Sequence, residues 1–415
     1  MTFLMSSDLL SNIYYFNPTC EYAIANGNAS WQPNKLLTTM EEDLSTLPLF
    51  FANPHDIVLV KKIPDHDYLA SLRSIGIDPP HFAQLRNITA NPGITGKPFG
   101  WLLPWGWSPV AHRVLASLKP HCSAEFLNSP VSEWKEESRE IYSKRFAILL
   151  QQKIISRLDP AIMPPPDMTP QICSQTGEID FLIKKWGKIM VKSPWSTSGR
   201  GIQPVTKIPV VPKVWEKITG MINQQGYVIV EPLLNKQLDL ALQFEIKNKK
   251  ITFLGISRFF TDKKGQYGGN FLNGWNNNSD EEIINFAGTI PSLLINPIIE
   301  EIKESNLLKL YEGNFGVDTL IFRSDDSKIR INTFLEINLR QNMGLLSIHL
   351  EKLIDFEKTG TFKIFYDPGT TFYNFKKKME ARHPVQIHNN KIKYGFFPLT
   401  PARETTKFGA YISVI

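Results

Sequence analysis

The sequence is poor in cysteine, has no long apolar run and carries little net charge, and each absence excludes a class of protein. Cys20, Cys122 and Cys173 are odd in number and far apart, which excludes a disulfide framework or a compact cysteine zinc site and favours a reducing, cytoplasmic location. No run approaches about 20 apolar residues, so we expect no membrane-spanning helix and no membrane partner. The net charge of +6 over 415 residues is too small to indicate nucleic acid as the main partner.

Several common catalytic motifs are also missing. The sequence contains no GxGxxG, HExxH or GxSxG, and its histidines have no metal-ligand spacing. The segment from Gly93 to Pro98 lacks the first glycine and the hydroxyl residue of a phosphate-binding P-loop. These absences direct attention to chemistry that needs no protein nucleophile.

The order of apolar runs predicts an α/β part followed by an α+β part. Asn12 to Phe16 and Asp56 to Lys61 have the composition of buried strands, and Asp67 to Ile75 has helical spacing. We therefore predict an N-terminal α/β domain over residues 1–130. A long helix is expected from Val131 to about Leu158, ended by prolines, and strands with short turns follow.

Beyond the strands we expect a central domain that ends near residue 350. A C-terminal extension is predicted over 351–415. It contains a β-hairpin whose turn is Asn389-Asn390, a pair that tolerates left-handed backbone angles.

Three polar residues alternate at the end of an apolar run in the central domain. On a strand, Glu336, Asn338 and Arg340 would project to one face while the residues between them enter the core. Carboxylate and amide oxygens suit a hard cation such as Mg²⁺, and Asp318 on the preceding strand is placed to reach the same ion. An ordinary half-exposed strand would show the same pattern, so the motif needs independent support.

A lysine at a predicted strand end opens a loop of small residues. Lys192 is followed by a segment that includes Ser196, Ser198, Gly199 and Gly201. Such a loop can close its backbone N–H groups over phosphates, with the lysine as a point charge. A plain turn between two strands is the alternative interpretation.

A further apolar strand ends in Glu-Pro and suggests a nucleotide-binding linker. After Glu231, Pro232 has no N–H, so a donor to an adenine edge would come from Leu233 or Leu234. Asp239 is an acceptor suited to ribose hydroxyls. Lys144, at the start of a helix before the proline-rich link, is either a solvated lysine or a phosphate ligand.

Taken together and in this order, these motifs resemble the ATP-grasp superfamily over roughly residues 131–348. The resemblance implies an ATP-grasp fold with a Rossmann-like N-terminal domain before it, and a central domain over 131–350 that clamps the nucleotide between two lobes. The small lobe would cover about 185–233 and the large lobe 234–350. ATP and Mg²⁺, or Mn²⁺, are the implied cofactors. The ATP ligands would be Lys144, Lys192, the loop from Ser196 to Gly201, Glu231, Leu233, Leu234 and Asp239, and the metal ligands would be Asp318, Glu336 and Asn338.

The family resemblance also implies a reaction. ATP would activate a substrate carboxylate as an acyl phosphate, which an amine then attacks to form a peptide or amide bond with release of ADP and phosphate. We expect Arg340, with Arg258 second, to stabilise the oxyanion. Candidate substrate contacts are Asn17, Glu21 and Asn26 after the first strand, and Tyr267 in the glycine-rich segment 262–274.

Two other functions fit the same motifs. A kinase of the same fold would transfer the γ-phosphate to an alcohol, and a nucleotide-binding module would bind ATP without turnover. The expected partners are small carboxylate and amine molecules, such as amino acids or peptides, and a homodimer is one possible assembly.

Overall fold

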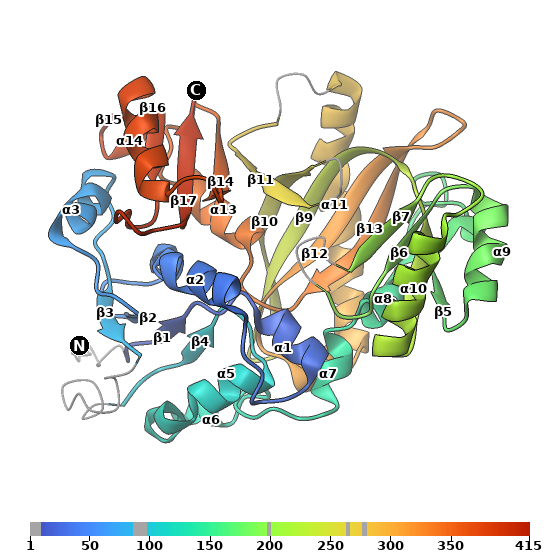
Figure 1. The fold of residues 1–415 in the computed structure, drawn as a ribbon, viewed down its shortest axis with the longest axis horizontal. Helices are drawn as coiled ribbons and strands as arrows, with labels where there is room; N and C mark the ends of the chain where they lie inside the picture. The colour runs from blue at the N-terminus through green and yellow to red at the C-terminus, as the bar shows by residue number, and fades with distance from the viewer. Residues whose placement is uncertain (1–9, 86–97, 197–200, 263–265, 276–279) are drawn as a thin grey trace, which may run out of the picture. The chain divides into compact units, whose positions relative to one another are not determined.

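The computed structural model describes residues 10–85, 98–196, 201–262, 266–275 and 280–415 (Figure 1). The chain divides into two compact units, and each is described by itself. Unit 1 comprises residues 1–134, 269–274 and 340–415, and unit 2 comprises 135–268 and 275–339. The C-terminal segment 351–415 therefore belongs to the same unit as the N-terminal domain.

The N-terminal part of unit 1 contains a four-stranded parallel sheet in the order β3-β2-β1-β4. Its strands are β1 (Ile13–Tyr15), β2 (Ile57–Val60), β3 (His81–Gln84) and β4 (Leu102–Pro104). The helices around it are α1 (Cys20–Asn26), α2 (Lys35–Asp43), η1 (Leu47–Phe50), α3 (His66–Ser74), α5 (Pro109–Val114), η2 (Ala116–His121) and α6 (Ala124–Leu127). The parallel α/β arrangement predicted from the first two strands and the helix near residue 70 is confirmed.

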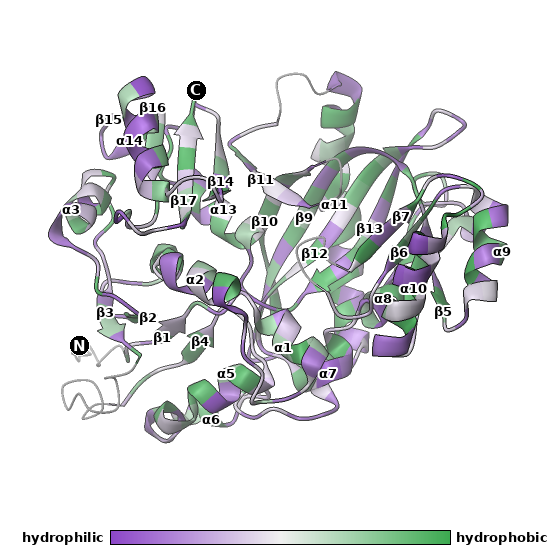
Figure 2. Cartoon of the chain, in the orientation of Figure 1, coloured by the Kyte–Doolittle hydropathy of each residue, from purple (hydrophilic) through white to green (hydrophobic). Residues whose placement is uncertain are grey.

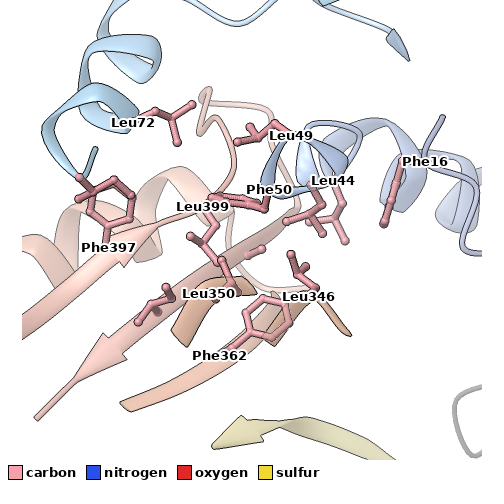
Figure 3. Packing of buried hydrophobic residues seen from close by; sticks show 14 of the residues in the cluster. Phe16, Leu44, Leu49, Phe50, Leu72, Leu346, Leu350, Phe362, Phe397 and Leu399 are labelled. Carbon is pink, nitrogen blue, oxygen red and sulfur yellow. The ribbon is translucent and has the colours of Figure 1, made fainter. Parts of the chain in front are cut away.

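The rest of unit 1 is antiparallel. Strand β11 (Tyr267–Leu272), which begins in unit 2, pairs with β14 (Gly360–Tyr366), and the order continues through β17 (Phe408–Val414), β16 (Lys391–Pro398) and β15 (Gln386–His388). Helices α13 (Met343–Glu351) and α14 (Phe372–Arg382) accompany these strands. One apolar cluster joins this part to the parallel sheet of the same unit, with Phe50, Leu350, Phe362 and Leu399 among its buried members (Figure 3).

Two local features shape the C-terminal strands. Asn389 and Asn390 have φ of 50° and 58°, which confirms the predicted left-handed turn between β15 and β16. In β17, Gly409 leaves room for the ring of Phe372 from α14, because a Cβ at that glycine would lie 2.1 Å from Phe372 Cγ.

Unit 2 contains a small four-stranded sheet in the order β5-β8-β6-β7. Its strands are β5 (Gln171–Cys173), β6 (Ile189–Lys192), β7 (Ile202–Val205) and β8 (Val228–Pro232). Helices α9 (Thr176–Trp186) and α10 (Pro212–Gln225) bury Ile179, Ile183 and Ile218 in a separate apolar core with the strands. This core holds the strand ends of Lys192 and Glu231 in fixed positions.

The larger strands of unit 2 run antiparallel in the order β13-β12-β9-β10. Their bounds are β9 (Asn235–Lys247), β10 (Lys250–Thr261), β12 (Gly313–Arg323) and β13 (Ile329–Asn338). Leu240, Leu242 and Phe244 are fully buried on one face of β9, and Asp239, Ala241 and Gln243 alternate with them (Figure 2). The face of Asp239 also carries Asp318 of β12, which pairs with Ala241.

The helix predicted from Val131 to Leu158 is shorter than expected. Residues 131–137 are not helical, α7 (Ser138–Ile141) is a single turn, and α8 covers Lys144–Ile155. Ser143 caps α8, since its Oγ accepts a hydrogen bond from Phe146 N at 3.2 Å. The cap places Lys144 at the first helical position, in the turn that faces the candidate site.

One described helix, α11 (Glu281–Glu304), is long and apolar enough to pass the length and composition test for a membrane span. Its buried residues include Ile283, Ile290, Leu294 and Ile298, at the three- and four-residue spacing of one helix face. The helix contacts β9 and β10. One face of α11 therefore packs on the sheet of unit 2, and the short helix α12 (Leu307–Leu310) lies close to it.

Candidate active site

Two acidic side chains face each other across neighbouring strands of unit 2. The register pairs Asp318 of β12 with Glu336 of β13, and the next row on the same face pairs Gly316 with Asn338. Directly opposed residues of antiparallel strands have Cβ atoms about 5 Å apart. The predicted grouping of Asp318, Glu336 and Asn338 is therefore present on one sheet face.

A bulge in β13 lies just before Glu336, opposite the residue that follows Asp318. Between Asp318 and Leu320 the register with β13 shifts, and Phe334 has φ of 54° although its side chain is buried. A left-handed phenylalanine is unfavourable by roughly 1–2 kcal/mol, so the surrounding contacts must impose it. Bulges of this kind reorient the side chains that follow them, and here Glu336 follows by two residues.

Lys144 connects the carboxylates to the predicted phosphate loop. Its Nζ donates to Glu336 Oε1 at 2.6 Å and to Ser196 O at 3.0 Å. The lysine side chain is almost fully buried. One ammonium group thus joins α8, β13 and the loop after β6, three segments that the sequence keeps far apart.

The loop after β6 is closed at its base by backbone contacts. Ser193 N donates to Gly201 O at 2.8 Å. Gly201 has φ of +72°, and a Cβ there would lie 2.8 Å from Ser196 Cβ. Only glycine fits this position without strain. Ser198 and Gly199, predicted to bind phosphate, lie outside the described residues.

Trp195 anchors the same loop, a role that the sequence did not reveal. Its Nε1 donates to Arg139 O at 3.1 Å, and the Arg139 guanidinium lies 4.3 Å from the centre of its ring. Its backbone N donates to Gln225 Oε1 at 3.0 Å. The tryptophan itself was the sequence signal for this anchor, because a freely moving loop of small residues does not need a large buried indole.

The strand-end lysine and the linker acid form an ion pair. Lys192 Nζ contacts Glu231 Oε1 between neighbouring strands β6 and β8, and both side chains are only slightly exposed. Burial raises the pKa of Asp239, while Lys236, Thr261 and the charge of Lys192 oppose that rise. Lys192, Glu231 and Asp239, predicted to bind the phosphates, the base and the ribose, therefore lie close enough for Lys192 to interact with both acids.

The linker between β8 and β9 has two residues, Leu233 and Leu234. Leu233 N donates to Lys188 O at 3.0 Å, so this N–H already has a backbone partner. Of the two donors predicted for an adenine edge, Leu234 is the better candidate.

The donor set on the sheet suits a hard cation. Asp318, Glu336 and Asn338 supply carboxylate and amide oxygens, which Mg²⁺ prefers, and phosphate oxygens usually complete its coordination. Within the described part of the chain, no three His, Cys, Asp or Glu side chains cluster as a preformed metal site.

Arg258 was predicted to line the same cleft, and the register contradicts this. The β9–β10 register shifts between Phe253 and Gly255, after which Arg258 pairs with Leu240. Leu240 lies on the buried face, whereas Asp239 and Ala241 lie on the face of Asp318. The bulge thus turns Arg258 to the other face of the sheet, where its guanidinium lies 5.4 Å from the ring of Trp275.

Arg340 lies in unit 1 and pairs with another predicted residue. β13 ends at Asn338, so the expected strand alternation does not extend to Arg340. Its Nε donates to Glu21 Oε1 at 3.0 Å, and both side chains are largely buried. Glu21 Oε2 is buried without a hydrogen-bond partner among the described atoms. A cation and a carboxylate expected at substrates are thus held together.

The other substrate candidates have local roles. Asn17 pairs through both amide atoms with the backbone of Gly106, at 2.8 and 3.3 Å, which ties the ends of β1 and β4 together. Asn26, the last residue of α1, is exposed and accepts a hydrogen bond from Asn28 N. Tyr267 begins β11, and burial raises its pKa. These hydrogen bonds give Asn17 and Asn26 structural roles that do not require a substrate.

Comparison with known proteins adds evidence about the fold. No protein-family model and no curated protein significantly matches the sequence. The chain is similar to the solved biotin carboxylase of Campylobacter jejuni, with 12% identity, a TM-score of 0.52 and coverage of 98% of this chain and 87% of that one. It is also similar to N5-carboxyaminoimidazole synthetase from Staphylococcus aureus, with 12% identity, a TM-score of 0.47 and coverage of 98% and 93%. At 12% identity, the likeness to the biotin carboxylase shows a shared fold alone, in which this chain combines a parallel α/β sheet with antiparallel sheets.

Proposed function

We propose that the protein is an ATP-dependent ligase that joins a substrate carboxylate to an amine. The observation that carries this proposal is the position of Lys144 Nζ, within 3.0 Å of Ser196 O and 2.6 Å of Glu336 Oε1. A loop suited to phosphates and carboxylates suited to a metal meet at one buried cation. The solved biotin carboxylase of similar fold is described as an ATP complex, which supports the choice of nucleotide.

The residues of unit 2 would divide the work of binding ATP. Lys192 and Lys144 exchange their carboxylate partners for phosphate oxygens, while Leu234 and Asp239 hold the base and the ribose. Asp318, Glu336 and Asn338 would hold magnesium, which supplies charge neutralisation on the phosphates. Positioning and electrostatic stabilisation account for most of the catalysis in phosphoryl transfer.

The reaction balances without a protein nucleophile. A carboxylate oxygen of the substrate attacks the γ-phosphorus, the bond to the β–γ bridging oxygen breaks, and ADP leaves. The amine nitrogen then attacks the acyl carbon, phosphate leaves, and the nitrogen loses a proton. We assign Arg340 to the oxyanion of the second step, because Glu21 holds its guanidinium in one orientation.

The test is to incubate the protein with ATP, magnesium and a mixture of amino acids and short peptides. We expect ADP release and a condensed product in the mass spectrum, and hydroxylamine should trap the acyl phosphate. A phosphorylated alcohol without a hydroxamate would instead identify a kinase. Magnesium-dependent ATP binding with no ADP from any mixture would identify a binding module.

Two variants separate the steps. Glu336→Ala removes a metal ligand and should abolish ADP release. Arg340→Met should retain formation of the hydroxylamine-trapped acyl phosphate but lose most of the amide product. An Arg340→Met variant with normal amide formation would contradict the assignment of the oxyanion role.

A further inference from the structure

The bulge in β13 decides which side chain faces Asp318. On one side of the bulge, Leu320 of β12 pairs with Asn332. Regular antiparallel pairing advances one residue on each strand, so continuing from this pair would place Phe334 opposite Asp318. The observed partner of Asp318 is Glu336. Two positions on β12 thus correspond to four on β13, and this excess of two residues creates the acidic pair of the candidate site.

Gln151 of α8 holds the bulge in place. Its Nε2 donates to Asn332 Oδ1 and to Thr333 O, each at 2.6 Å. Both hydrogens of this amide nitrogen are therefore used. Gln151 is only 1% exposed, and hydrogen bonds between buried groups are costly to lose. Thr333 Oγ1 also lies 3.1 Å from Thr319 Oγ1 of β12, so the bulge is tied to the helix and to the neighbouring strand.

The bulge needs such ties because its backbone is unfavourable. Phe334 is buried and has a φ of 54°, which is costly for a residue with a Cβ. Regular pairing would relieve this angle, but it would carry Glu336 two residues, about 7 Å, along the strand from Asp318. The bulged register therefore depends on contacts from outside the two strands.

We propose that Gln151 is a positioning residue that keeps Glu336 opposite Asp318 by fixing the bulge. It acts through Asn332 and Thr333, and the same register sets Asn338 in the next row. The inference rests on the proposed ligase function only for its consequence, which is that the residues so positioned would hold the magnesium of a bound nucleotide. The register itself belongs to the fold and is testable without a ligand.

A disulfide probe tests the register directly in the full-length protein. Asp318→Cys combined with Glu336→Cys puts two thiols on opposed residues, whose Cα separation of about 4.5–5.5 Å suits a disulfide. Oxidation with diamide should cross-link this pair, identified in digests by mass spectrometry; the native cysteines are buried. Adding Gln151→Met, which keeps the size of the side chain but removes its donor, should lower the yield at least about tenfold.

The exposed neighbour on the same helix supplies the matched control. Gln152→Met should leave the cross-link of the Asp318→Cys, Glu336→Cys protein unchanged. Equal yields with Gln151→Met and Gln152→Met would overturn the proposal. Failure to cross-link with both glutamines intact would overturn it as well, because the two positions would then not be opposed.

Nucleotide binding separates positioning from a general loss of stability. ADP is titrated calorimetrically into the full-length protein, once with magnesium and once with EDTA. Gln151→Met should bind ADP like the wild type in EDTA but lose most of the gain in affinity that magnesium gives the wild type. Ile290→Val, a buried change on α11, also lowers stability but should keep that gain. Equal weakening of Gln151→Met with and without magnesium would reduce Gln151 to a structural role and refute positioning.

The outcomes remain distinct from those of the ligase assay. If the protein binds no nucleotide, the ligase is refuted, and the cross-link alone decides whether Gln151 sets the register. If ADP is released with a condensed product while the cross-link is indifferent to Gln151, the ligase stands and the positioning role is refuted.

Discussion

Lys144 and Gln151 lie seven residues apart on one face of α8 and hold β13 on either side of Phe334. Lys144 Nζ donates to Glu336 beyond the bulge, and Gln151 Nε2 donates to Asn332 Oδ1 and Thr333 O before it, each at 2.6 Å. The unfavourable backbone of Phe334 is thus enclosed between two tethers from a single helix. The direction of Glu336 depends on both of them.

Replacing Gln151 with leucine should destabilise the protein. Gln151 is buried, and its loss leaves Asn332 Oδ1 and the Thr333 carbonyl without a donor in the interior. We expect the free energy of unfolding to fall by about 1–3 kcal/mol in urea titrations. Gln152→Leu changes the exposed neighbour on the same helix. Its free energy of unfolding should fall by less than about 0.5 kcal/mol. Equal losses would mean that the tether is not energetically important.

Gly201→Ala should strain the loop after β6. Its positive φ of +72° and the short Cβ distance to Ser196 both oppose a side chain. We expect a loss of about 1–3 kcal/mol in the free energy of unfolding, measured in urea, together with weaker ATP binding. Gly220→Ala provides the control, because nothing lies within 4 Å of a Cβ at that helical position. That variant should gain about 0.5–1 kcal/mol, and a similar gain at position 201 would contradict the loop geometry.

Lys192→Met should weaken ATP binding at least about tenfold in calorimetric titrations, because a cation for the phosphates is lost. Lys188→Met, at an exposed position just before the same strand, should bind ATP normally.

A second variant removes an ambiguity from that experiment. In the single variant, Glu231 loses its ion-pair partner and would repel phosphates. Lys192→Met combined with Glu231→Gln should therefore recover only part of the affinity. Full recovery would show that the lysine serves to neutralise Glu231 rather than to bind ATP.

Glu41 should make stability depend on pH in a recognisable direction. Its pKa is raised from 4.5 to about 7 by burial, so the folded protein holds this proton more tightly than the unfolded chain. The stability it contributes is fully present below about pH 4.5 and is lost as the pH rises through about 7. The difference in unfolding free energy between wild type and Glu41→Gln should fall by about 1–3 kcal/mol between pH 4.5 and 8.

The comparison with Glu41→Gln cancels opposing titrations. Burial lowers the pKa of His112 to about 3 and that of His349 to about 4. Each histidine therefore lowers the free energy of unfolding as the pH falls below about 6.5, and it does so equally in the wild type and in Glu41→Gln. A pH-independent difference would refute the shift at Glu41.

Local sequence signals predicted most of the elements because these depend on near neighbours. The composition of Asn12 to Phe16 was enough for β1, and Asn389-Asn390 was enough for the turn after β15. Pro291, which would be expected near a helix start, lies inside α11 instead, because that helix begins ten residues earlier, after an Asp280 cap. A proline that sits on one face of a long helix does not end it when the packing of the other face on a sheet compensates.

The site was harder because its geometry depends on bulges and distant partners. Strict alternation from Ile251 and Phe253 would put Arg258 on the polar face, and one extra residue near Leu254 reverses this. Alternation predicted Glu336 and Asn338 correctly, since no bulge separates them. The pairing of Arg340 with Glu21 spans 319 residues, and no local pattern encodes such a contact.

The ring of Phe372 over Gly409 has a consequence for how the C-terminal region opens. Because the aromatic ring occupies the space of the missing side chain, Phe372 of α14 and the backbone of β17 at Gly409 are buried against each other. The two segments should exchange their amide hydrogens as one cooperative block, and any larger residue at position 409 would release both together, exposing the last strand of the chain to proteases.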